Sequence, residues 1–174
     1  MSRVYLTDLR TNPKRSLLDK IEDLLNRIKT KERIKKSDLV ALKLHFGEKG
    51  NTAYLRPIFI RRIGDYVKKL GARPFITDTN TLYSGSRSDS IDHLNTAIYN
   101  GFDYASTGCP IVIADGIRGS NGVRVSIDGE VLKEVSIAGD IMNADSLVAI
   151  THFKAHELSG FGGALKNLGM GCAS

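Results

Sequence analysis

Histidine and aspartate side chains follow several of the strands that the sequence predicts. Both residue types can act as general acids or bases, and both can bind a divalent metal. The residues concerned are His45, Asp78, Asp115, His152 and His156. Because ligands of parallel sheets bind beyond the carboxyl ends of the strands, we expect these side chains to converge on one site.

Two roles are open to this group. His152 and His156 are candidate acid–base catalysts, and their spacing would place both on one face of a helical turn. The candidate metal ligands are His45, Asp115, His152 and His156. No His-Glu-x-x-His signature supports the metal, and each residue alone could instead cap a helix or bind loop backbone.

A glycine-rich tail could hold an anion. Its glycines would expose backbone N–H groups beside Lys166, which suits a phosphate or a carboxylate. It is not a Walker A loop, because Leu165 precedes the lysine and Asn167 follows it. The alternative for this tail is a flexible loop.

Arg87, near Tyr83, could bind an anion through two N–H groups of its planar guanidinium. The alternative for Arg87 is a surface salt bridge. The candidate ligand- or cofactor-binding residues are Asp78, Asn80, Tyr83, Arg87, Gly160, Gly162, Gly163, Lys166 and Asn167.

Apolar runs alternate with amphipathic segments along the chain. Strands are expected at 4–7, 39–44, 74–78, 111–114 and 147–151. Helices are expected to begin at Ser16 and Pro57, and a third covers 91–98 with Ile91, Leu94, Ala97 and Ile98 facing inward. This order predicts one α/β domain over 1–174, with a mostly parallel sheet covered by helices on both faces.

Two shorter features interrupt the alternation. Alternating residues around Asp128-Gly129 predict a β-hairpin insertion over 123–135 with a type I′ turn. A short helix is expected over 137–143, before the last strand.

Composition restricts the partners. The net charge is +6, with 19 Lys/Arg against 8 Asp/Glu in residues 1–74 and 6 against 11 in the rest. A basic first half could dock an acidic partner, but no aromatic residues interleave the charges of the first helix, so we do not expect nucleic acid there. No apolar run approaches the roughly 20 residues of a membrane span, and no signal peptide is evident, so a cytoplasmic protein without a membrane partner is expected. Cys109 and Cys172 are expected to be reduced.

Several motifs together resemble one family. They are His45-Phe46-Gly47-Glu48, Asp78 to Tyr83 with Arg87, Asp115-Gly116, and 152–157 followed by 160–172. This pattern is similar to the uncharacterised iron-sulfur-centre proteins, the domain of unknown function 362. The resemblance spans nearly the whole chain from Val4. It implies a cytoplasmic α/β domain followed by a ferredoxin-like segment with two four-iron clusters.

The sequence ends at Ser174, before any Cys-x-x-Cys-x-x-Cys run. We therefore expect an N-terminal part of a longer redox protein, whose iron–sulfur clusters belong to the ferredoxin-like part. Its expected partner is that ferredoxin-like domain or an electron-transfer protein. A remoter similarity, to the N-terminal domain of nickel-dependent lactate racemases, implies an acid–base role for His156 and attachment of a pyridinium-derived nickel cofactor at Lys166.

Two hypotheses about function follow. The first is a redox or metal-cofactor-dependent enzyme domain that binds a small anionic substrate or cofactor. The alternative is a basic binding module that docks an acidic partner or nucleic acid and whose glycine-rich tail is only a linker. The substrate and the reaction stay open.

Overall fold

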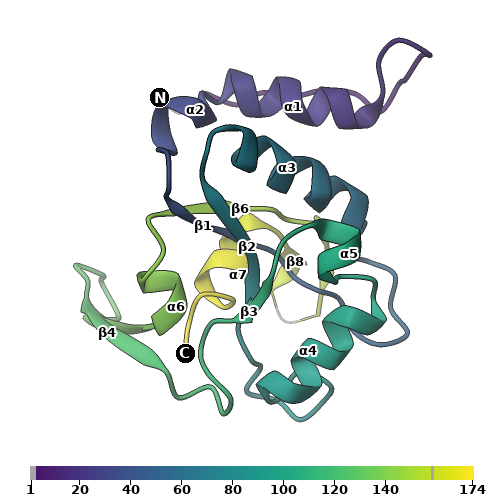
Figure 1. Ribbon diagram of the computed structural model, residues 1–174. Helices are drawn as coiled ribbons and strands as arrows, with labels where there is room; N and C mark the ends of the chain where they lie inside the picture. Colours follow the sequence, from purple (N-terminus) through teal and green to yellow (C-terminus); the bar gives the residue numbers. More distant parts are fainter. Residues whose placement is uncertain (1–2, 158) are drawn as a thin grey trace.

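The computed structural model describes residues 3–157 and 159–174. Its centre is a sheet of four parallel strands in the order β3-β2-β1-β6, flanked by helices (Figure 1). The predicted α/β class is therefore confirmed. The strands are β1 (Leu39–Lys43), β2 (Arg73–Asp78), β3 (Ile111–Ile113) and β6 (Ser146–Ala149).

Strand β1 is the buried centre of the sheet. Its residues Val40, Ala41 and Leu42 are fully buried, which explains why the sequence shows a continuous apolar run rather than an alternation. It pairs with β2 on one side and with β6, distant in sequence, on the other. The chain therefore adds β2 and β3 on one side of β1 and then returns to add β6 on the other side. Open parallel sheets bind ligands at such a switch point, here between β1 and β6.

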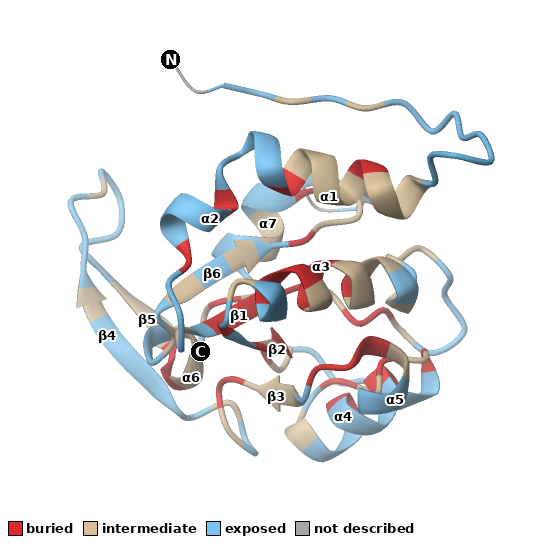
Figure 2. Ribbon diagram, turned by 45° about the horizontal axis from the view of Figure 1, so that its top comes forward, coloured by how far each residue is buried: buried red, intermediate tan, exposed pale blue. Residues whose placement is uncertain are grey.

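Helix α3 (Pro57–Lys69) packs on the sheet through Ile60, Ile63 and Val67. Helix α1 (Leu17–Arg27), capped by Ser16 as expected, lies outside α3, and Figure 2 shows the buried residues concentrated beneath it. The shorter helices are α2 (Thr30–Arg33), α4 (Ser90–Tyr99), α5 (Tyr104–Thr107), α6 (Gly139–Met142) and α7 (Ala164–Gly169). None of the helices described has the length and apolar character needed to span a membrane.

A close approach at Gly64 fixes how α3 packs against the segment before β3. A Cβ atom at this position would lie 2.5 Å from Cys109 Sγ, which is fully buried. We expect Gly64→Ala to lower the free energy of unfolding by about 1–3 kcal/mol in chemical denaturation, because overpacking outweighs the better helix propensity of alanine. Gly169→Ala in α7 is the control, since its Cβ meets nothing within 4 Å. Equal effects of the two substitutions would contradict the packing argument.

The inward face of α4 is polar, contrary to prediction. Ile91 and Ile98 are 61% and 48% exposed, and Leu94 is exposed as well, while Ala97 is buried as expected. The buried positions carry polar groups that satisfy backbone carbonyls near the sheet edge. Thr96 Oγ1 donates to Ser86 O at 2.7 Å, and the flanking Asn100 Nδ2 donates to Phe46 O at 2.9 Å. Buried carbonyls need such partners, so hydrogen bonding decides the orientation of this helix.

The expected first strand is absent. Residues 4–7 are not paired with any described strand, and the side chain of Val4 is 90% exposed. A strand cannot form where its backbone groups have no neighbour to bond. The residue that follows this segment, Asp8, is instead bound to α1 by the buried Lys20 side chain.

The hairpin exists, but its turn differs from the prediction. Strands β4 (Gly122–Ser126) and β5 (Glu134–Ala138) are antiparallel, with Ser126 opposite Glu134. This register leaves a seven-residue connection instead of a two-residue turn at Asp128-Gly129, and Ile127 N–H bonds to Lys133 O at 2.9 Å across its base. Residue 137 lies in β5, so the following helix α6 is shorter than expected.

The tail is structured rather than a flexible loop. Strands β7 (Lys154–His156) and β8 (Gly160–Gly162) form a second hairpin, which leads into α7. Gly160 has a φ of +71°, a conformation that glycine adopts without strain where the chain reverses. His156 lies on strand β7, so His152 and His156 do not share the face of a helical turn.

Candidate functional site

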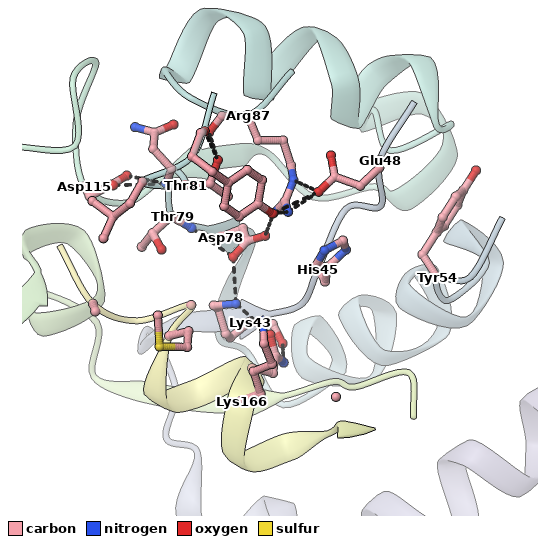
Figure 3. A pocket seen from close by; sticks show the side chains of 18 of the residues that line it. Lys43, His45, Glu48, Tyr54, Asp78, Thr79, Thr81, Arg87, Asp115 and Lys166 are labelled. Carbon is pink, nitrogen blue, oxygen red and sulfur yellow. Dashed lines mark hydrogen bonds and ion pairs between the residues drawn. The ribbon is translucent and has the colours of Figure 1, made fainter. Parts of the chain in front are cut away.

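A pocket of about 420 Å³ lies at the carboxyl ends of the central strands (Figure 3). Every residue singled out from the sequence lines it, except Gly160. The convergence expected from the parallel-strand rule is therefore present, while the roles assigned to these residues stay predictions. The lining residues that the sequence analysis missed include Lys43, Glu48, Tyr54, Thr79, Arg118 and Lys154.

Lys43 is the buried centre of this site. Its side chain is completely shielded from solvent. The ammonium donates to Asp78 Oδ1 at 2.8 Å and to Asn167 Oδ1 at 2.7 Å. It ends β1 and belongs to an otherwise apolar run, and a lysine within such a run is the signal that could have identified it.

Asp78, at the end of β2, is the carboxylate that holds several groups together. Besides Lys43, it accepts the Thr79 N–H at 3.0 Å and lies 3.5 Å from Arg87 Nη1 and 3.6 Å from His93 Nε2. Burial alone would raise the pKa of this carboxyl, but the Lys43 ammonium and His93 hold it well below its usual range. Asp78 is thus an anion at all ordinary pH values and is suited to organising cations rather than transferring protons.

Arg87 is engaged by acidic and phenolic partners within the protein. Its Nε donates to Glu48 Oε1 at 2.8 Å, and its Nη2 donates to the Tyr83 hydroxyl at 2.7 Å. The guanidinium is buried, so this is not the surface salt bridge considered as the alternative. Its guanidinium is already bound to Glu48 and lies beside Asp78. Arg87 therefore holds together the side chains of one wall of the pocket.

Asp115 and Asn80 join the loops after β3 and β2. Both carboxylate oxygens of Asp115 accept the Asn80 N–H, at 3.1 and 3.0 Å, and Asn80 Nδ2 donates to Gly116 O at 2.8 Å. Burial raises the pKa of Asp115. These bonds hold together two loops that line the pocket.

Asn167 connects α7 to the point where the strand order reverses. Its Nδ2 donates to Thr151 Oγ1 at 2.9 Å and lies 3.4 Å from the carbonyl oxygens of Lys43 and Ile150. The residue therefore spans the ends of β1 and β6. This is a structural role that the anion-binding interpretation of the tail did not foresee.

Three cations in the pocket have no acidic partner among residues 3–157 and 159–174. Lys154, Lys166 and Arg118 line the cavity, and none of them forms a side-chain hydrogen bond or ion pair with a described residue. Burial and the neighbouring charge of Arg87 lower the pKa of Lys154.

The histidines occupy different environments. His45 Nδ1 accepts the Gly47 N–H at 2.8 Å, and burial, together with the Arg87 charge, lowers the His45 pKa to about 4. His156 Nδ1 accepts the Ser159 N–H at 3.2 Å. His152 Nδ1 is buried with no hydrogen-bond partner in the described structure. His93 is fully buried beside Asp78 and does not line the pocket.

A family model described as a domain of unknown function, DUF362, matches residues 40–174. The chain belongs to the DUF362 family. No curated protein matches it, and no solved structure matches it. All residues lining the pocket fall within the matched part of the DUF362 chain, whereas α1 and α2 precede it.

The cysteines of this DUF362 chain do not fit a four-iron cluster. Such a cluster needs four ligands, typically thiolates, and only Cys109 and Cys172 occur. Cys109 is buried beside α3. Cys172 is buried next to the β4–β5 hairpin, where its carbonyl accepts the Ala138 N–H. The described residues also contain no group of three or more His, Cys, Asp or Glu side chains placed to hold a metal ion.

Proposed function

We propose that this DUF362 domain binds a small anionic substrate or cofactor in the pocket, as the ligand-binding part of a longer iron–sulfur redox protein. The observation that carries the anionic ligand is the presence of Lys154, Lys166 and Arg118 on the walls without acidic partners in the described structure. Unpaired cations in a recess favour a ligand of opposite charge.

Asp78 and Glu48 are already paired with cations of the pocket. Asp78 is paired with Lys43 and Glu48 is bound by Arg87, whereas Asp115 accepts only a backbone N–H group. The two paired carboxylates therefore do little to repel an incoming anion. The unpaired side chains that face a ligand in the pocket are therefore mainly positive, although the second half of the chain is acidic overall.

Acid–base chemistry is proposed for His152 and His156, which line the same cavity as the cations. On the racemase resemblance, Lys166 would carry the cofactor, and its amine lies free of any described partner. Electrons would reach the pocket from the ferredoxin-like part that the family resemblance implies. A divalent metal bound by the pocket histidines stays a prediction, which elemental analysis of the purified protein tests.

The alternative of a basic docking module receives no specific support. Several basic side chains of the first half are paired locally, among them Arg62 and Lys69, which share Glu22 between α3 and α1. This pairing fits a role in packing the helices together.

Removal of the pocket cations tests the proposal. We expect Lys154→Gln and Lys166→Gln each to weaken binding of phosphate or of a small carboxylate at least tenfold in titration calorimetry, because each removes a charge-assisted contact worth about 1.5–3 kcal/mol. Lys31→Gln, on the exposed surface of α2, is the matched control and should leave the affinity unchanged. Unchanged binding in both pocket variants, with thermal unfolding intact, would refute the proposal.

A further inference from the structure

We propose that His45 is an uncharged hydrogen-bond donor of the pocket and that its Nε2–H group binds a neutral oxygen of the ligand. The ligand is then an acid that carries a carbonyl oxygen near its anionic group. The inference rests on the proposed anion binding and adds a second recognition element to it.

The hydrogen bond from Gly47 determines which nitrogen of His45 carries the proton. Gly47 N–H donates to His45 Nδ1 at 2.8 Å. A nitrogen that accepts a hydrogen bond must keep its lone pair, so the single proton of the neutral ring is on Nε2. Gly47 can present its N–H in this way because its φ is +87°, and a side chain there would collide with the Tyr54 ring.

The surroundings of His45 oppose a positive charge on the ring. Burial is the largest influence and acts with the charges of Arg87 and Lys154, while Asp78 and Glu48 act in the opposite sense. The two carboxylates are already bound by Lys43 and Arg87, so they are poorly placed to stabilise an imidazolium. These surroundings agree with the hydrogen bond from Gly47 to Nδ1, which by itself requires a neutral ring protonated on Nε2.

The Nε2–H group of His45 is available to a ligand. No residue among 3–157 and 159–174 accepts a hydrogen bond from it, and the ring lines the cavity together with Lys154 and Lys166 (Figure 3). The lysines provide charge, which any anion satisfies. A neutral donor instead contributes selectivity for an additional oxygen acceptor, because an acid without that oxygen would leave the donor unbonded.

The first experiment examines the ligand-free protein. We expect the nitrogen-15 NMR signals of labelled histidine, assigned to His45 by their loss in His45→Gln, to show the Nε2–H tautomer at pH 7.5. An Nδ1–H tautomer, or a ring protonated on both nitrogens at this pH, would overturn the inference whether or not any ligand is known.

The second experiment compares 2-oxobutyrate with butyrate, which has the same charge but lacks the oxo group. In titration calorimetry at pH 7.5, we expect wild-type protein to bind the oxo acid about fivefold more tightly, as one hydrogen bond of about 1 kcal/mol provides. His45→Leu should abolish this preference, while His45→Gln, which retains a donor, should keep part of it. Thermal unfolding of both variants verifies that they fold.

The outcomes separate the two proposals. Equal binding of the two acids by wild-type protein overturns the role of His45 while leaving anion binding intact. Failure of both acids, and of phosphate, to bind counts against the proposed function, and the NMR measurement then still decides the state of His45.

Discussion

Replacing Asp78 by alanine is expected to lower the free energy of unfolding by about 3–5 kcal/mol, measured by chemical denaturation at pH 7. The substitution leaves the Lys43 ammonium, which is completely buried, and the nearly buried Arg87 guanidinium without their shared carboxylate. An uncompensated charge in the interior costs far more than the lost attraction of an exposed pair.

Two further variants test this explanation. Lys43→Met in the Asp78→Ala background should recover much of the lost stability, because it removes the stranded ammonium. Arg124→Ala removes an exposed pair with Glu134 and should change stability by no more than about 1 kcal/mol. If Asp78→Ala costs no more than Arg124→Ala, the buried network is not what stabilises this edge of the sheet.

The second large effect is a loss of stability at acidic pH that arises from His45. The His45 pKa is lowered from 6.5 to about 4 in the folded protein, so the unfolded chain binds a proton at a higher pH than the folded chain does. The free energy of unfolding should therefore fall as the pH decreases from about 7 to 4, by on the order of 3 kcal/mol from this residue, and the contribution should level off below about pH 4.

This acid effect is measured as a difference between two proteins. The pH dependence of unfolding in wild-type protein minus that of His45→Gln isolates the histidine, because the carboxylates titrate in both. Parallel curves across pH 4–7 would show that the ring is not held neutral by its surroundings.

The sheet and its ligand-binding edge were predictable because they follow from strong, general rules. Buried parallel strands appear as apolar runs, and their carboxyl ends must share an edge. This reasoning placed His45, Asp78 and Asp115 together although 70 residues separate the first from the last.

The parts that failed depend on partners the sequence does not reveal. The lysine within an apolar run could have drawn attention to Lys43, but nothing local to it indicates that Asp78 and Asn167 will bind its ammonium. In α4 and its C-cap, polar side chains face inward because they bond the carbonyls of Phe46 and Ser86, so the apolar positions point outward. The hairpin and helix of the tail were not predicted, because glycines have low propensity for both structures and obscured them.

The bonds of Lys43 have a consequence for how the site assembles. This one ammonium joins groups 35 and 124 residues away along the chain. Contacts of such long range form slowly, since the intervening chain must be ordered first. The binding pocket is thus completed only when β1, β2 and α7 have all docked, so an occupied pocket would oppose global unfolding and not merely local opening.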